Sequence, residues 1–282
     1  MKFAMYNGFI ENVRDVGIER AAEKALQLGF SSVEVFADLV SGNRNPIDDL
    51  TTAANVRKTL DQYGLTVSCY SVYADLWRNP TGESELKRHV RMAAVLGSPY
   101  IHHTLLPWLV PPETMPTSEV VIQDVAEAAV RIADYAATMG ITCIYEIQGY
   151  YVNGVKGFRL FWDKVKSQCD NVGICGDLGN ALFVNEKPEN FLAEFASDIC
   201  HVHVKDYQCQ RATTSPGRYW THAIDDIWLR DSVVGNGVVD FRTCLSILKD
   251  SGYDGCFALE NGHPEPFEEG VHQAMAHLLE LW

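Results

Sequence analysis

A unit made of a helix-like segment, a glycine and a β-rich run recurs along this 282-residue chain. Four copies span residues 21–36, 53–72, 87–104 and 127–147, and a fifth ends within residues 245–261. A glycine just after a helix is typical of a helix that ends in a left-handed conformation. The repeat therefore predicts helices that lead directly into strands. The glycines in this position are Gly29, Gly64, Gly97, Gly140 and Gly252.

Eight strands are predicted in all, with helical segments between them. They lie near residues 2–6, 32–37, 65–72, 99–105, 141–148, 172–177, 199–205 and 255–260. This alternation favours a (β/α)8 TIM barrel over a doubly wound sheet, and no GxGxxG pattern of a dinucleotide site follows the first strand. We therefore predict an α/β barrel in one domain, residues 1–282, with a long loop at residues 207–240 after the seventh strand.

Composition and charge argue against several classes of protein. Hydrophobic residues make up 47% of the chain, but no apolar run approaches the ~20 residues that a membrane span needs. The first residues also lack the long apolar stretch of an export signal, so we expect a cytoplasmic protein without a membrane partner. The formal net charge of −14 argues against a nucleic-acid partner, because phosphate binding requires a basic surface. No pair of the eight cysteines has CxxC spacing, which argues against cysteine-ligated zinc.

Polar residues close four of the predicted strands. They are Glu146, Asp177, His203 and Glu260. A barrel places its active site at the carboxyl ends of its strands, so these side chains are expected to converge. For any one of them alone, a structural role such as an ion pair at the rim is an equal alternative. Together, three carboxylates and one imidazole suit a divalent ion: Mn²⁺, Mg²⁺, Co²⁺ or Zn²⁺.

Histidines cluster in two of the predicted strands. Side chains alternate along a strand, so His201, His203 and Lys205 of ICHVHVKDY share one face. We expect His201 to have a structural or supporting role, and metal binding by His201 in place of His203 is the alternative. Lys205 is expected to stabilise negative charge on a substrate oxygen or to pair with a carboxylate. His102 and His103 lie on opposite faces, so at most one faces the barrel mouth, and a structural role is favoured for both.

Further residues are candidates for contact with a substrate. Glu34 in the second strand and Gln148, two residues after Glu146, could bind hydroxyl groups, although a salt bridge is an equal alternative for Glu34. Trp108 lies in a loop-like stretch and could stack on a sugar or pack a lid. Arg211 in the long loop could meet a phosphate or carboxylate, although a solvated cation is the commoner case.

The motif order YE, GDLGN, HVHVKD, GNGVVDF and GYDGCFALEN resembles the sugar phosphate isomerase/epimerase family of xylose-isomerase-like TIM barrels. The resemblance is strongest over residues 140–261. It implies that the four strand-end residues bind one divalent metal and that Glu146 and Glu260 are the catalytic acid/base pair. Family members often carry a substrate-binding histidine where this chain has Asn180, and ketose 3-epimerases carry a glutamate where it has Val152. An amide at 180 could still bind a substrate hydroxyl.

The resemblance implies a metal-dependent isomerase or epimerase that acts on a ketose or keto-polyol through an enediolate. A metal-dependent lyase, dehydratase or keto-glycoside-cleaving enzyme on the same scaffold is the alternative, because it begins with the same proton abstraction. A sugar-binding barrel without activity is a weaker alternative, since it would not need two placed glutamates. The expected partner is a small-molecule sugar, and the family likeness implies a homo-oligomer.

Overall fold

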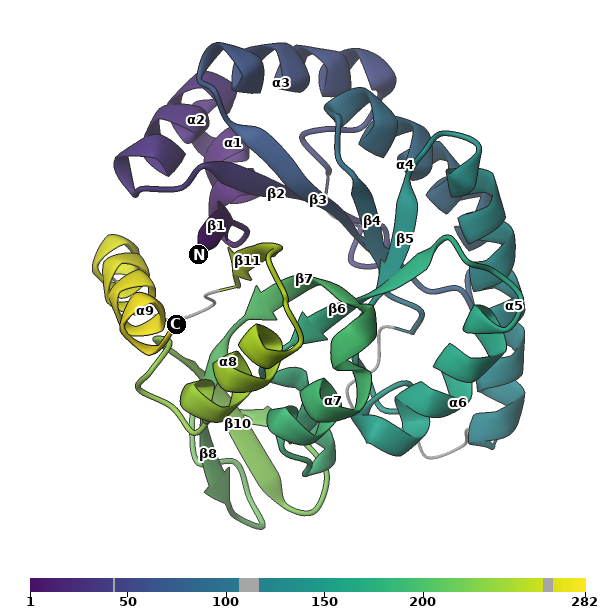
Figure 1. Ribbon diagram of the computed structural model, residues 1–282, viewed down its shortest axis with the longest axis vertical. Coiled ribbons are helices and arrows are strands. Elements are labelled where there is room, and N and C mark those ends of the chain that lie inside the picture. Colours follow the sequence, from purple (N-terminus) through teal and green to yellow (C-terminus); the bar gives the residue numbers. More distant parts are fainter. Residues whose placement is uncertain (43, 107–116, 261–265) are drawn as a thin grey trace.

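Eight parallel strands close into a barrel, and helices surround it (Figure 1). The computed structural model describes residues 1–42, 44–106, 117–260 and 266–282. The predicted barrel and its strands are confirmed, and β1 closes the ring by pairing with β11, with Lys2 opposite Cys256. The barrel strands are β1 (Lys2–Met5), β2 (Ser32–Asp38), β3 (Thr66–Tyr73), β4 (Tyr100–His103), β5 (Thr142–Tyr145), β6 (Val172–Asp177), β7 (Ile199–Val204) and β11 (Cys256–Leu259).

The helices end as the glycine pattern predicts. The five predicted glycines all have positive φ, between 68° and 90°, which a side chain would disfavour. None of the described helices is long and apolar enough to cross a membrane. The helices are α1 (Phe9–Val16), α2 (Ile18–Gln27), α3 (Leu50–Gln62), α4 (Gly82–Leu96), α5 (Ser118–Ala137), α6 (Gly154–Lys166), α7 (Pro188–Phe195), α8 (Phe241–Asp250) and α9 (Phe267–Leu281).

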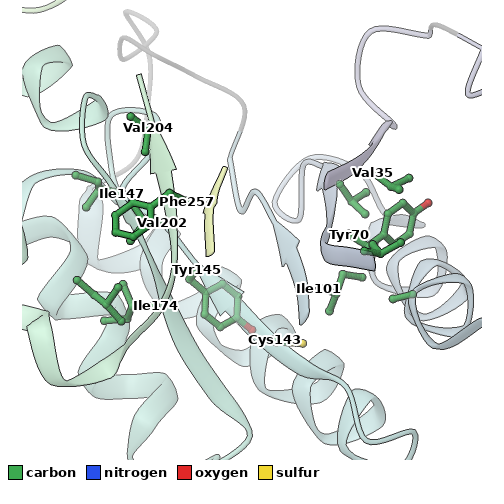
Figure 2. Close-up of a cluster of buried hydrophobic side chains, with 14 of the residues drawn as sticks. Val35, Tyr70, Ile101, Cys143, Tyr145, Ile147, Ile174, Val202, Val204 and Phe257 are labelled. Carbon is green, nitrogen blue, oxygen red and sulfur yellow. The ribbon is translucent and has the colours of Figure 1, made fainter. Parts of the chain in front are cut away.

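The two faces of the strands have different chemistry. The outward face carries large apolar side chains, which pack in the main hydrophobic core; Figure 2 shows Val202 and Val204 of β7 beside Phe257 of β11. Fully burying one such side chain contributes roughly 1.5–3 kcal/mol. The inward face of β7 instead carries His201 and His203, both almost completely buried. The apolar outer face thus holds the barrel together, and the interior is free to carry polar groups.

Much of the segment predicted as a long loop is an antiparallel sheet. Strand β10 (Ile227–Ser232) lies between β8 (Asp206–Arg211) and β9 (Thr221–His222), and this sheet projects from the barrel on the side of α7 and α8 (Figure 1). Alternate residues Ile227 and Leu229 pack on Tyr207 and Phe183 in a small apolar cluster. The sequence did not predict this sheet, because its alternating apolar residues are few and lie within a polar, glycine-rich segment.

Asp206 fastens this segment to the end of β7. Its buried carboxylate accepts hydrogen bonds from the backbone N–H groups of Tyr207, Gly235, Gly237 and Val239, at 2.7–3.2 Å. Gly237 leaves no room for a side chain, because a Cβ there would lie 2.2 Å from Asp206 Oδ1. Residues 235–239 are therefore held directly beside the strand that carries the histidines.

Candidate metal centre and active site

A cavity of about 370 Å³ opens at the carboxyl ends of the barrel strands. Aromatic side chains of Tyr6, Phe36 and Tyr73 form part of its wall. Its remaining lining includes both apolar side chains and polar ones, among which are Asn7, Glu11, His102, Glu146, Gln148 and Glu260. A mixed aromatic and hydrogen-bonding wall is suited to a small polar molecule such as a sugar.

The four strand-end residues converge at the floor of this cavity. Glu146 follows β5, Asp177 ends β6, His203 lies in β7 and Glu260 follows β11. One ligand atom of each lies within 4.8 Å of the others. His203 Nδ1 is 2.9 Å from Glu146 Oε2, 3.6 Å from Glu260 Oε2 and 4.0 Å from Asp177 Oδ2. The sequence thus identified residues that the fold brings together.

The donor set of this cluster fits a single divalent cation. Three carboxylates meet in a largely buried space, and in the described residues one ammonium, that of Lys205, lies against them. Burial raises the pKa of Glu146 to about 7, although His203 opposes this effect. The buried negative charge is therefore costly, and a cation would compensate it. Carboxylate oxygens with one imidazole nitrogen suit Mg²⁺, Mn²⁺, Co²⁺ or Zn²⁺.

Lys205 and Asn180 are bonded to each other and to the cluster. Lys205 Nζ is 2.9 Å from Asp177 Oδ2 and 2.6 Å from Glu260 Oε2, and it donates to Asn180 Oδ1 at 3.2 Å. Burial alone would lower the pKa of Lys205, but Asp177 and Glu260 raise it well above its ordinary value. The Asn180 amide donates to the Ile147 carbonyl at 2.9 Å. The ion pair was one of two predicted roles for Lys205; contact of either residue with substrate remains a prediction.

The other predicted substrate-binding residues lie in different places. Gln148 lines the cavity, as its position after Glu146 suggests. Arg211 lies at the exposed end of β8 and donates to the Asp225 carbonyl at 3.1 Å, away from the cavity lining. Trp108 lies outside the described residues. Their predicted contacts with substrate remain predictions.

Glu34 lies below the cavity rather than on its wall, and its carboxylate is completely buried. Its Oε2 is 2.7 Å from His201 Nε2, and its Oε1 is 3.0 Å from His203 Nε2 and accepts the Ser71 hydroxyl. Ser71 Oγ in turn is 3.0 Å from His102 Nδ1. Burial alone would raise the pKa of Glu34, but the two histidines together lower it well below its ordinary value. The carboxylate is therefore ionised and fully engaged by its neighbours.

Sequence reasoning missed Tyr6 and favoured a structural role for His102, yet both lie beside the cluster. Tyr6, one residue beyond β1, stacks on the His203 ring with centroids 5.0 Å apart. His102 faces the interior with Nε2 3.5 Å from Glu146 Oε1, whereas His103 faces outward and packs on Tyr145. The sequence signal that could have identified both residues is their position at the carboxyl end of a barrel strand.

A family model described as xylose isomerase-like TIM barrel matches residues 22–281. The chain belongs to this family. The barrel, its strand-end cluster of carboxylates with an imidazole, and the predicted likeness agree with this membership.

Curated and structural relatives of this xylose isomerase-like barrel carry different names. The inosose dehydratase of Yersinia enterocolitica is 27% identical over 158 residues, which is 53% of this chain and 52% of that protein. The chain thus spans about half the length of the curated relatives it matches. Solved structures similar over almost the whole chain include the D-psicose 3-epimerase of Clostridium cellulolyticum with D-tagatose (TM-score 0.75, 15% identity, 100% and 99% coverage). A second is a Mycobacterium smegmatis protein of the same barrel type in complex with magnesium (TM-score 0.72, 17% identity, 99% and 96% coverage). At these identities the structures support the fold.

Proposed function

We propose that this chain is a divalent-metal-dependent sugar isomerase or epimerase that removes and returns a proton beside the carbonyl group of a ketose or keto-polyol. The observation that carries the proposal is the arrangement of two glutamates around His203. Glu146 and Glu260 both approach His203 Nδ1, at 2.9 Å and 3.6 Å, and both line the cavity. Two carboxylates at one small-molecule site can serve as a base and an acid.

The protein groups have distinct parts in this reaction. When bound, a divalent ion would polarise a carbonyl oxygen and stabilise the negative charge that develops beside it. Glu146, whose pKa burial raises to about 7, is suited to accept a proton near neutral pH. Lys205 holds Glu260 through a 2.6 Å ion pair and so fixes the second carboxylate. The ring of Tyr6 stacks on that of His203 and also lines the cavity.

A dehydratase is the second candidate function. The relatives named inosose dehydratase support it, because removal of water from a keto-polyol can begin with the same proton abstraction. The two functions differ in the group that leaves after the proton is removed. The arrangement of Glu146 and Glu260 serves both.

The first experiment measures bound metal and proton exchange together. Protein purified without chelator is assayed for metal per chain by elemental mass spectrometry. It is then incubated in D₂O with ketoses and with inososes, and proton NMR follows deuterium entry beside the carbonyl. We expect about one divalent ion per chain and metal-dependent exchange with at least one substrate class.

Product analysis separates the two candidate functions. A rearranged sugar of unchanged mass supports the isomerase or epimerase, and a product lighter by one water supports the dehydratase. The matched control is the Glu146→Gln, Glu260→Gln double variant, which should lose both metal and exchange. Absence of divalent metal after reconstitution with Mn²⁺, or undiminished exchange in the double variant, would contradict the proposal.

A further inference from the structure

We infer that Glu34 is a positioning residue for the metal centre: its buried carboxylate holds His203 Nε2 so that Nδ1 faces Glu146, Asp177 and Glu260. This inference rests on the proposed metal-dependent function and assigns Glu34 a role other than contact with substrate. Glu34 lies on β2, across the barrel from the strands that supply the cluster, and it contributes no atom to the four-residue cluster.

The contacts of Glu34 point to orientation of the imidazole. Its Oε1 is 3.0 Å from His203 Nε2, and the opposite ring nitrogen, Nδ1, faces the three carboxylates of the cluster. At this distance Glu34 Oε1 is placed to accept a hydrogen bond from His203 Nε2–H. That hydrogen bond favours the neutral tautomer whose Nδ1 lone pair is free for a cation.

The neighbours of Glu34 keep its carboxylate from turning. His201 holds Oε2 at 2.7 Å, and the Ser71 hydroxyl donates to Oε1, the oxygen that also contacts His203. Glu34 is 0% exposed, so neither solvent nor a substrate in the cavity reaches it. An ionised group buried to this extent, with both oxygens engaged by ring nitrogens, has one stable orientation.

The same network also reaches Glu146. Ser71 Oγ lies 3.0 Å from His102 Nδ1, and His102 Nε2 lies 3.5 Å from Glu146 Oε1. Glu34 is thus connected to one ligand through His203 and to another through Ser71 and His102. A change at Glu34 should therefore lower the affinity of the cluster for a cation and leave the side chains of the cavity wall largely in place.

The test compares metal affinity in Glu34→Gln and in the wild type. Glutamine has a similar shape but removes the charge and leaves one acceptor oxygen for two imidazoles. Dissociation constants for Mn²⁺ are measured by competition with a chelating dye on the folded protein, with folding verified by circular dichroism. We expect affinity to fall about 10- to 100-fold, the usual effect of losing the carboxylate partner of a metal-binding histidine.

The matched control is His89→Gln. His89 is also fully buried and its Nδ1 lies 2.7 Å from the Tyr70 hydroxyl, but it lies on α4, outside the barrel. This variant should lose stability and keep wild-type Mn²⁺ affinity. An equal loss of affinity in the two variants would show a general effect of destabilisation and would overturn the inference, as would unchanged affinity in Glu34→Gln.

A second measurement needs no variant. Nitrogen NMR of ¹⁵N-histidine-labelled, zinc-loaded wild type should show His203 protonated at Nε2, and a deprotonated Nε2 would overturn the inference. If the wild type bound no divalent ion at all, the proposed function would fail first. If it bound one ion but Glu34→Gln had wild-type affinity, the inference alone would fail.

Discussion

Replacing Lys205 by methionine should strongly destabilise the metal-free protein. The ammonium is almost completely buried, and Nζ lies 2.9 Å from Asp177 Oδ2 and 2.6 Å from Glu260 Oε2. Methionine has similar length but no charge, so it would leave two carboxylates beside each other without the ammonium that pairs with both. Removing one partner of a buried ion pair typically costs about 3–5 kcal/mol of unfolding free energy.

The size of the effect in a thermal melt follows from the chain length. An unfolding entropy of about 2.1 cal/mol/K per residue over 282 residues converts this loss into a fall in Tm of about 5–8 °C. The assay is differential scanning calorimetry of chelator-treated protein. The matched control is Lys87→Met, whose partly exposed i,i+4 pair with Glu83 at 2.7 Å should be worth less than about 1 kcal/mol.

Metal addition provides the second half of this test. Mn²⁺ should raise Tm more in Lys205→Met than in the wild type, because the cation then meets the carboxylates without a competing ammonium. Equal Tm losses in Lys205→Met and Lys87→Met would refute the reasoning. Equal Mn²⁺-induced shifts in the variant and the wild type would also refute it, since they would place the metal away from Asp177 and Glu260.

Three further predictions follow from the geometry. Glu146→Gln at saturating metal should slow deuterium exchange into substrate by about 10²- to 10⁴-fold in NMR assays, and a smaller effect would assign the base elsewhere. Burial lowers the pKa of His89 to about 4. The unfolded state therefore binds more protons than the folded state between pH 6.5 and 4. As the pH falls through this range, the free energy of unfolding should decrease by up to about 3 kcal/mol. Urea titrations should show this slope reduced in His89→Gln, and an unchanged slope would contradict the assignment. Gly237→Ala should cost about 1–3 kcal/mol in urea unfolding, because its Cβ would overlap Asp206; wild-type stability would show that the turn relaxes freely.

The fold could be predicted because its signals are local. Five helix ends carry a glycine such as Gly97, whose positive φ is a property of a single residue, and each barrel strand is a short β-rich run. Eight predicted strands with helices between them were sufficient to predict the barrel. The sheet formed by β8, β9 and β10 was missed because its buried residues are few and separated by polar ones.

The site could be predicted only in part. The convergence of Glu146, Asp177 and Glu260 could be predicted because the carboxyl ends of barrel strands lie together at one end of the barrel. The surroundings of Glu34 could not be predicted, since contacts with His201 and His203 join residues more than 160 positions apart and depend on barrel closure. The local sequence around a glutamate in a barrel strand does not show whether its side chain lines the cavity or lies buried against histidines of other strands.

The pairing of β1 with β11 makes the order of synthesis matter for the proposed metal centre. On the ribosome, the first strand is made long before its partner, so the growing chain exposes unpaired strand edges until residues 256–259 emerge. Glu260 arrives in the same step and completes the proposed ligand set that begins with Glu146. A chain truncated before this point would lack both the closing strand and the last ligand. Tight metal uptake should therefore report that translation and ring closure are complete.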